Sequence, residues 1–354
     1  MSNVNPWHRY DILGIGVVAV DDIIYLDRFP SPDSKMVVGE RRREGGGLTA
    51  TALVAASRLG AKCAYAAMLG TDELSAWSVA ELEREGVDCS AVIRKEGVAP
   101  CHSTILVVRE TGQRTILSGI GGMRSFPAEA VTEALVSSAK VLFLDHTQGE
   151  AGLKAARLAA KLGIPVVADI ETARDPGTAA LAAAAGHLIA SEEYARDVCG
   201  AKGPGGAKGP GGAKGTGGAK GTGGEENPAA RLSADPAVRL SAEPARAVAV
   251  MARPDRACAA VTAGAKGCWY SESGGPVVHV PAYRVRAVDT TGCGDVFHGA
   301  YAAVIARGGG VAGAVAVATA AAAIKATRPG GRSGIPGMDE VGAFMKVNSK
   351  HLAG

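Results

Sequence analysis

Apolar residues along the chain follow two alternating patterns. Short, nearly continuous apolar runs are separated by alanine-rich stretches in which apolar residues recur at helical spacing. The stretch LTATALVAASRL (48–59) has this spacing and stops at Gly60, a residue that favours a helix end. Strands that alternate with helices predict a parallel sheet covered by helices on both faces. The runs that predict its strands are 11–21, which ends on Asp21, then 140–145, 163–170, 185–191 and 256–264.

Two segments depart from this rhythm. Residues 103–118 contain two β-rich runs joined by a turn that includes Gly112, which predicts a hairpin. The residues from 22 to 45 form an apolar run and then a polar stretch that leads into a run of three glycines. These segments predict a small second sheet. The fold class expected is therefore α/β, with a mostly parallel central sheet between two helical layers and a small β-sheet beside it.

One segment has a repetitive composition. Residues 201–224 contain AKGPGG twice and AKGTGG twice, and the related octapeptides RLSADPAV and RLSAEPAR follow. Such a composition is typical of a flexible linker. The repeated glycines have no flanking strand and helix, so they do not predict a phosphate-binding loop. We interpret 201–245 as a low-complexity flexible insertion that extends from a surface loop and takes no part in the chemistry.

Composition limits the class of protein. The chain has 354 residues, 47% of them hydrophobic, and a net charge of +3, which favours neither nucleic acid nor a membrane surface as a partner. Its seven cysteines are scattered without C-x-x-C spacing, which predicts reduced thiols rather than a disulfide scaffold or a zinc site. The first residues lack the order of a signal peptide, and the longest uncharged apolar run, 311–324, is too short to span a bilayer. We expect a cytoplasmic, soluble protein.

The strongest candidate for chemistry is DTTGCGD (289–295), which precedes a helical pattern. Glycine at 292 and 294 permits left-handed backbone angles, so that consecutive N–H groups converge on one point at a helix N-terminus. This arrangement binds anions and suits a transferring phosphoryl group. Asp295, ionised at neutral pH if its pKa is ordinary, would accept the proton of a substrate hydroxyl. The alternative, that Asp295 only caps the helix, accounts for the aspartate but not for both glycines.

Three other features have simpler interpretations. The segment GGGVAG (308–313) follows a helical pattern rather than a strand, so it predicts a turn between helices and not a dinucleotide site. The sequence contains no G-K-[ST], which excludes a P-loop of the Walker type. His298 lies one helical turn after Asp295, and we interpret it as a packing or surface residue rather than a partner of the aspartate.

Two segments resemble the signatures of the ribokinase-like (PfkB) carbohydrate kinases. DTTGCGDVFHGA resembles the C-terminal signature, and residues 44–72 resemble the N-terminal one. The resemblance extends over 11–340 and implies a three-layer kinase domain with a β-sheet lid from about 22–45 and 97–122, leaving 341–354 as a tail. It also implies an enzyme that uses ATP and Mg²⁺. The family roles fall on Asp295 as the base, on Gly292, Cys293 and Gly294 as the anion hole, and on Asp21, Gly45 and Gly46 as sugar contacts.

The resemblance also implies a nucleotide site. Ser191 stands where the family has the Asn of N-x-x-E, and Tyr194 replaces the Glu, which weakens the expected contact with Mg²⁺. VTAGAKG (261–267) resembles the segment beside the ATP phosphates, which assigns Thr262, Gly264 and Gly267 to ATP. TRPGG (327–331) resembles the loop beside the adenine and assigns Gly330 to the same ligand. In several members this loop, together with the residues matching Asp289 and Thr291, also holds a monovalent cation such as K⁺.

The motifs define the sugar substrate less well than they define the reaction. Ala50 stands where many members have an Asn that binds the sugar. The motif details resemble the sulfofructose kinase branch most, and Lys35 matches a lysine that this branch uses near the anionic end of its substrate. The Asn and Arg that accompany this lysine are replaced by Ser118 and Thr147. Lys35 is therefore a candidate substrate contact, with an ordinary solvated loop lysine as the alternative.

The function expected is ATP-dependent phosphorylation of a primary hydroxyl on a sugar or sugar derivative. The alternatives are a 6-deoxy-6-sulfofructose kinase, a nucleoside kinase and a sugar-binding regulator without activity. A purine acceptor would favour aromatic stacking, and the lid segments offer only Tyr25 and Phe29. Lid sheets in this family often pair between subunits, so the resemblance also implies a homodimer through the lid.

Overall fold

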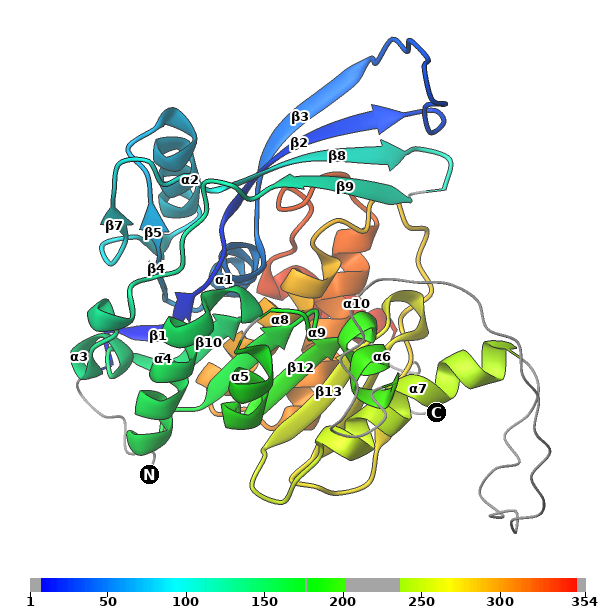
Figure 1. Ribbon diagram of the computed structural model, residues 1–354. Coiled ribbons are helices and arrows are strands. Elements are labelled where there is room, and N and C mark those ends of the chain that lie inside the picture. Colours follow the sequence, from blue (N-terminus) through cyan, green and yellow to red (C-terminus); the bar gives the residue numbers. More distant parts are fainter. Residues whose placement is uncertain (1–7, 112, 176, 201–235, 349–354) are drawn as a thin grey trace, which may run out of the picture.

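The computed structural model describes residues 8–348 except 112, 176 and 201–235 (Figure 1). Three sheets form among these residues, and two of them define the architecture. The third pairs only the short strands β5 (Met68–Leu69) and β7 (Ile93–Arg94). A large sheet lies between two layers of helices, and a smaller sheet extends over one end of it (Figure 1). This arrangement confirms the predicted fold class.

The large sheet has nine strands in the order β15-β14-β13-β12-β11-β10-β1-β4-β6. The pairs from β6 to β13 are parallel, and β14 and β15 are added antiparallel at one edge. Its central strands are fully buried and rich in Val, Ile, Leu and Ala, as expected of a sheet covered on both faces. The strands are β1 (Tyr10–Ile15), β4 (Cys63–Ala66), β6 (Val87–Asp88), β10 (Ala139–Asp145), β11 (Val166–Ile170), β12 (His187–Ser191), β13 (Cys258–Thr262), β14 (Cys268–Glu272) and β15 (Val278–Val280).

Helices cover both faces of this sheet. One buried cluster forms between the sheet and α1, α8 and α9, and a second forms beneath α4, α5 and α7 on the opposite face. In the described part of the chain, none of the helices has both the length and the apolar character needed to cross a bilayer. The helices are α1 (Leu48–Arg58), α2 (Glu73–Arg84), α3 (Glu133–Val136), α4 (Gly149–Lys161), α5 (Thr178–Ala184), α6 (Glu192–Gly200), α7 (Pro236–Met251), α8 (Cys293–Ala306), α9 (Val311–Ala326) and α10 (Met338–Val347).

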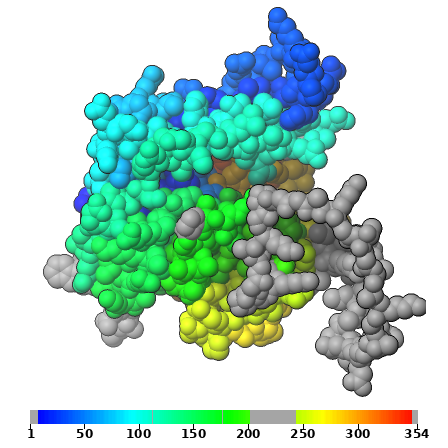
Figure 2. Space-filling view, viewed as in Figure 1, coloured from blue at the N-terminus to red at the C-terminus, as the bar shows by residue number. Residues whose placement is uncertain are grey.

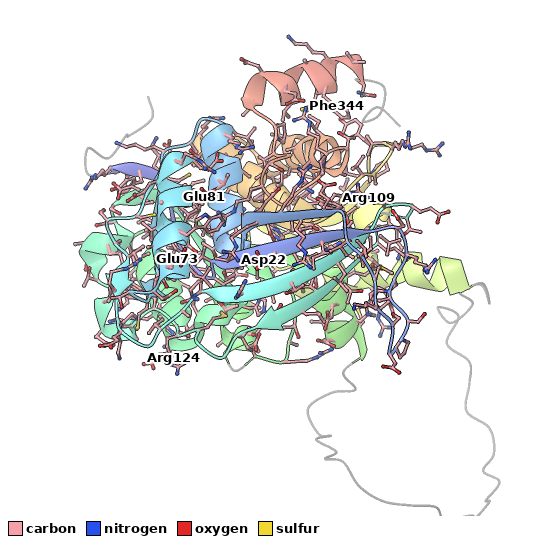
Figure 3. All side chains as sticks on the ribbon, turned by 90° about the horizontal axis from the view of Figure 1, so that it is seen from above. Asp22, Glu73, Glu81, Arg109, Arg124 and Phe344 are labelled. Carbon is pink, nitrogen blue, oxygen red and sulfur yellow. The ribbon has the colours of Figure 1, made fainter. Side chains whose placement is uncertain are left out.

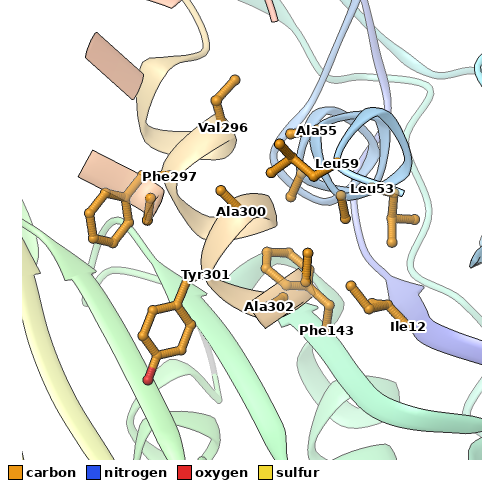
Figure 4. Close-up of a cluster of buried hydrophobic side chains, with 14 of the residues drawn as sticks. Ile12, Leu53, Ala55, Leu59, Phe143, Val296, Phe297, Ala300, Tyr301 and Ala302 are labelled. Carbon is orange, nitrogen blue, oxygen red and sulfur yellow. The ribbon is translucent and has the colours of Figure 1, made fainter. Parts of the chain in front are cut away.

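The position of α8 is set by close packing in the core (Figure 4). Its residues Ala300 and Tyr301 are fully buried, in a cluster that also contains Leu53 of α1 and Phe143 of β10. A Cβ at Gly299 would lie 2.0 Å from the Ala52 carbonyl oxygen, so only glycine lets the two helices approach this closely. This packing fixes the helix whose N-terminus carries the candidate chemistry.

The small sheet is formed by the segments from which the family resemblance predicts a lid, and we use that name for it. Its order is β3-β2-β8-β9, with β2 and β8 parallel and the two outer pairs antiparallel. The predicted hairpin is confirmed as β8 and β9, although Gly112 in its turn lies outside the described residues. Figure 2 shows the lid above the body of the molecule, with a hollow between them. The strands are β2 (Ala19–Leu26), β3 (Glu40–Gly46), β8 (Cys101–Val108) and β9 (Arg114–Gly119).

Charged side chains lie on the surface of the lid. Asp22 lies on β2 of the lid (Figure 3). It accepts hydrogen bonds from Arg43 of β3, and its second oxygen lies 2.8 Å from His102 of β8. These three side chains connect three neighbouring strands on one face of the lid.

The run 11–21 is two strands rather than one. β1 ends at Ile15 and β2 begins at Ala19, so Asp21 belongs to the lid and not to the end of the first strand. The break follows from Gly16, where a Cβ would lie 1.8 Å from Thr49 Oγ1 and 2.2 Å from Asp145 Oδ2. The chain bends there because the Asp145 carboxylate accepts the Val17 N–H at 2.7 Å.

Two predicted boundaries are also wrong. Residues 236–245 of the expected insertion belong to helix α7, which contacts β13 and β14, while 201–235 lie outside the described residues. Proline at position 236 is compatible with a first helical turn, because the N–H that it lacks would have no partner there. The first half of the expected tail, 341–347, belongs to helix α10, in which Val341 is buried and the centroid of the Phe344 ring lies 4.9 Å from that of Tyr283.

Candidate active site

A cavity of about 250 Å³ lies between the lid and the N-terminus of α8. Its walls come from lid strands β2, β3, β8 and β9, from the loop before α8, and from the chain after β11. Parallel strands and helix N-termini commonly form ligand sites at such an edge. Seven of the predicted site residues line the cavity, namely Asp21, Gly45, Gly46, Thr291, Gly292, Gly294 and Asp295.

The turn before α8 presents unpaired backbone donors. Gly292, at φ 74°, is the N-cap of the helix, and this left-handed angle requires glycine. Among the described residues, no hydrogen-bond acceptor faces the N–H groups of Gly292, Gly294 and Asp295, whereas the Cys293 N–H donates to the Thr290 carbonyl at 3.3 Å. The first N–H groups of a helix attract anions. The free N–H groups are therefore those of residues 292, 294 and 295, whereas the predicted anion hole consists of residues 292, 293 and 294.

Asp295 is half-buried in the cavity, and its acidity differs from the expectation. Burial, together with the nearby Glu171 carboxylate, raises the pKa of this carboxyl to about 8, although Arg114 acts in the opposite direction. At neutral pH the protonated form of Asp295 is therefore favoured in the free protein. This differs from the expectation of an ordinary carboxylate, because the sequence shows neither the burial of the group nor the distant residue Glu171 beside it.

Asp21 faces the same cavity from strand β2. Its side chain is 7% exposed, and burial raises its pKa to about 6 although Arg332 and Ser103 lower it. Two glycines make room for this group. A Cβ at Gly46 would lie 1.9 Å from Asp21 Oδ2, and one at Gly45 would lie 2.2 Å from Arg332 Nη1. Small residues at both positions are thus required by the packing of the charged side chains.

Two arginines of the site were not predicted. Arg114 of β9 lines the cavity and donates to Thr290 Oγ1 at 2.8 Å, and among the described residues it forms no ion pair. Arg332 is buried and donates to the Gly46 carbonyl at 2.6 Å and to Thr51 Oγ1 at 3.2 Å. Both arginines are distant from 289–295 in the sequence. The segments that contain them do not mark either arginine as a site residue. Only the folded chain brings these charges to the cavity.

The predicted nucleotide residues gather at a neighbouring part of the same edge. Ser191 and Thr262 are register partners on β12 and β13. The Ser191 hydroxyl accepts the N–H groups of Glu193 and Tyr194, both at 3.1 Å, so its side chain caps helix α6. It also donates to the Glu171 carbonyl at 2.7 Å, which ties this cap to the cavity wall.

Gly264 and Gly267 form the turn between β13 and β14. Both have positive φ, 53° and 94°. A Cβ at 267 would lie 2.1 Å from the Val280 carbonyl oxygen, so this glycine is required by strand packing. Gly330 is next to the cavity residue Gly331, and its N–H donates to Tyr25 and to Asp289, both at 3.0 Å. The Gly330 N–H is thus bonded within the protein.

Three further predicted residues lie outside the cavity wall. Lys35 is exposed in the loop between β2 and β3, and Cys293 is not among the residues that line the cavity, although its neighbours 292 and 294 are. His298 is buried, with Nδ1 2.7 Å from the Gly294 carbonyl oxygen, which confirms it as a packing residue. Of the two replaced positions, Ser118 lines the cavity and the Thr147 N–H is bonded to Asp145.

The oxygen donors of the cavity suit a magnesium ion that is held by a carboxylate together with the substrate phosphates. The described residues contain no group of three or more His, Cys, Asp and Glu side chains that could hold a metal ion. Mg²⁺ commonly binds through one or two carboxylates together with substrate phosphates. Glu171, exposed to the cavity beside Asp295, is a carboxylate suited to that role.

Asp289, one of the residues expected to hold potassium, already has protein partners. Its carbonyl oxygen accepts the ammonium of Lys325 at 2.8 Å, and both of its carboxylate oxygens accept other protein donors. A positive charge of the chain itself therefore lies where the expected cation would approach Asp289.

Comparisons with known proteins find relatives over nearly the whole chain. Residues 12–338 match the model of the pfkB family of carbohydrate kinases, a range that contains both signature segments. An ATP-dependent ribose-1-phosphate kinase from Halopiger xanaduensis is 25% identical over 334 residues, 94% of this chain and 97% of the relative. A ribokinase from Haemophilus influenzae is 24% identical over 342 residues, 96% of this chain and 99% of the relative.

Solved structures share the fold. Arabidopsis thaliana ribokinase, in complex with ribose and ATP, has a TM-score of 0.70 and 17% identity, covering 95% of this chain and 98% of that chain. At this identity the likeness shows the architecture alone. The large sheet and the lid are thus a known combination.

Proposed function

The chain belongs to the pfkB family of carbohydrate kinases, and we propose that it transfers the terminal phosphate of ATP to a hydroxymethyl group of a furanose-like sugar or sugar derivative. The observation that carries this proposal is the cluster of free N–H groups at 292, 294 and 295 beside the Asp295 carboxyl, facing one cavity. In-line phosphoryl transfer requires hydrogen-bond donors for the phosphate and a base for the attacking hydroxyl at the same point.

The phosphate end of the cavity is electropositive. The three amides meet the N-terminus of α8, and the Arg114 guanidinium lies at the same wall. As the terminal phosphate leaves ADP, its equatorial oxygens would accept these hydrogen bonds. Magnesium, when bound, supplies charge neutralisation between the phosphates, and Glu171 is the residue that would hold it.

Asp295 is the base in this mechanism. It accepts the proton of the sugar hydroxyl while the new oxygen–phosphorus bond forms, and its raised pKa makes it a stronger proton acceptor than an ordinary aspartate. Arg114 already lowers this pKa in the free protein, and the positive charge of a bound metal would lower it further in the complex. The carboxyl is thus able to ionise when its substrate is in place.

The sugar end of the cavity is formed by the lid. Asp21 and Ser103 offer side-chain oxygens from β2 and β8, and the backbone of Gly45 and Gly46 lies beside them. A carboxylate that accepts two vicinal hydroxyls is a specific contact for a sugar, because an acceptor without them would leave it buried and unpaired. This wall favours a polyhydroxylated acceptor.

The nature of the acceptor beyond this class is open to test. The described residues of the cavity wall include no aromatic side chain, which disfavours a nucleoside base. Lys35 lies outside the wall, which disfavours a sulfonate clamp on that residue. Arg114 would suit a second anionic group on the acceptor, as in a sugar phosphate, the acceptor class named in the Halopiger relative.

We test the proposal by measuring ADP formation with ATP and Mg²⁺ across a panel of pentoses, hexoses, sugar phosphates, sulfosugars and nucleosides. The expected result is activity with a free or phosphorylated furanose, with the product phosphorylated at its primary hydroxyl. Saturating binding of sugars without any ADP formation would identify a regulator instead. Activity with nucleosides alone would contradict the inference that the cavity wall disfavours a nucleoside base.

The lid also supports a proposal about assembly. Strand β9 is the edge of the small sheet, and all six of its residues are exposed. Leu117 and Ile116 on opposite faces of this strand are 57% and 47% exposed, which is unusual for an edge strand. We propose that the lid of a second copy covers this edge in a homodimer.

A further inference from the structure

Lys325 is a buried charge that the mechanism above does not use. It lies in the last turn of α9, and its side chain is completely buried. A lysine ammonium is costly to bury unless it is paired, so its surroundings should explain its presence. Burial lowers the pKa of Lys325, while the nearby Cys293 and Asp289 raise it.

The partner of this ammonium is the turn that leads to the free amides. Nζ donates to the Asp289 carbonyl oxygen at 2.8 Å and lies 4.0 Å from the Asp289 carboxylate. The positive charge of Lys325 lowers the pKa of Asp289 and so keeps that buried carboxyl ionised. The lysine thus donates a hydrogen bond to the main chain of Asp289 and balances the charge of its side chain.

Asp289 in turn organises three parts of the molecule. One carboxylate oxygen accepts the Thr291 N–H at 2.8 Å, at the start of the glycine turn. The other accepts the Tyr25 hydroxyl of lid strand β2 and the Gly330 N–H, each at 3.0 Å. The turn, the lid and the loop after α9 therefore meet at one carboxylate, whose charge is balanced by Lys325.

We propose that the Lys325 ammonium takes the place of a dissociable monovalent cation beside Asp289, so that the chain carries its own cation and its phosphoryl transfer does not depend on K⁺. The proposal rests on the proposed function, because the turn that Lys325 holds in place is the turn proposed to bind the phosphate. Lys325 touches no substrate and acts as a positioning residue. It holds Asp289 and Thr291 so that the N–H groups at 292, 294 and 295 keep their direction.

The first test uses the wild-type protein. ADP formation and the thermal unfolding midpoint are measured in KCl, NaCl and tetramethylammonium chloride at equal ionic strength, so that screening is constant. We expect K⁺ to change kcat by less than the ~5-fold that a coupled effector typically produces, and to leave the midpoint unchanged. Saturable activation by K⁺, or a midpoint raised by K⁺ alone, would overturn the proposal.

The second test uses Lys325→Ala, which opens a space for an ion. In tetramethylammonium chloride we expect kcat to fall ~10²-fold, the cost of a slightly misplaced catalytic group, with KM changed much less. Added K⁺ should then restore kcat in a saturable manner and raise the unfolding midpoint of the variant. Full activity of Lys325→Ala without any small cation would also overturn the proposal.

Thr319→Val is the matched control. Thr319 is buried on the same helix, and its hydroxyl donates to Val315 without contacting Asp289. This variant should show neither the loss of kcat nor a response to K⁺. The thermal measurements need no acceptor, so they decide the role of Lys325 even if the acceptor panel is negative. If Lys325→Ala does not fold, the wild-type measurements alone still confirm or overturn the proposal.

Discussion

At the scale of single residues, the site depends on the surroundings of Asp295 more than on its identity. The sequence motif identifies this aspartate, but its acidity comes from burial, from Glu171 and from Arg114, which lie in other elements. Arg332 and the free N–H of Asp295 were not predicted either. The hydrogen bond of the Cys293 N–H to Thr290 depends on the folded turn, which the sequence does not show. A motif can name a catalytic residue without giving its electrostatics.

The raised pKa of Asp295 predicts the pH dependence of the free enzyme. The base must be ionised, so kcat/KM should rise with pH through about 8 and then level off. Glu171→Gln removes a neighbouring negative charge and should move this rise to lower pH. Glu150→Gln, an exposed residue on α4, is the control and should leave the profile unchanged. A wild-type rise centred near pH 4 would contradict the account.

The same pKa predicts an effect on stability. Unfolded Asp295 ionises above its ordinary pKa of ~3.9, whereas the folded protein holds the proton up to about 8, so this group makes folding less favourable as pH rises through that window. Asp295→Asn removes the titration. Its unfolding midpoint should therefore exceed that of the wild type, by more at pH 8 than at pH 5. An equal or lower midpoint at pH 8 would contradict the burial of this charge.

At the scale of elements, helical and strand patterns predicted most of what the structure contains. The parallel strands, α1, α8 and the hairpin of the lid follow from apolar periodicity, since each buries one continuous face or is covered on both. The errors arose where tertiary contacts decide the boundary. Gly16 divides the first apolar run because Asp145 and Thr49 occupy its flank, and α10 is helical because Phe344 and Val341 pack against the body.

The close approach of β3 to Asp21 gives a test at this scale. Gly46→Ala places a methyl group where the Asp21 carboxylate lies, so the carboxylate must move away from the sugar. We expect the sugar KM to rise ~10-fold, as when a hydrogen bond to a charged group is lost, while the KM for ATP stays the same. Gly313→Ala on α9 has open space around its Cβ and should change neither constant. An unchanged sugar KM in Gly46→Ala would exclude Asp21 from the sugar site.

At the scale of the whole molecule, the architecture and the family were accessible from paired signatures, but the connection between lid and body was not. Tyr25 of the lid bonds to Asp289, and Glu44 of β3 accepts the Arg332 N–H at 3.0 Å and the Ser333 hydroxyl at 2.9 Å. These contacts join segments from opposite ends of the chain. No local pattern predicts such pairs, because each residue type is ordinary in its own segment.

The exposed edge of the lid predicts the assembly state. Sedimentation should show a dimer, because an uncovered apolar edge strand favours pairing with a second copy. Leu117→Lys should shift the protein to monomers, whereas Val37→Lys, in an exposed loop of the same lid, should not. A monomeric wild type at micromolar concentration would refute the proposed homodimer.

The central claim is that phosphate transfer takes place where Asp295 meets the free amides of the α8 N-terminus. Its most direct measurement is the turnover of Asp295→Asn, made together with the binding of ATP and sugar. Asn keeps the shape but cannot take the proton, so kcat should fall by ~10²–10⁴-fold while both ligands bind with nearly unchanged affinity. Turnover close to that of the wild type, with binding intact, would contradict the claim.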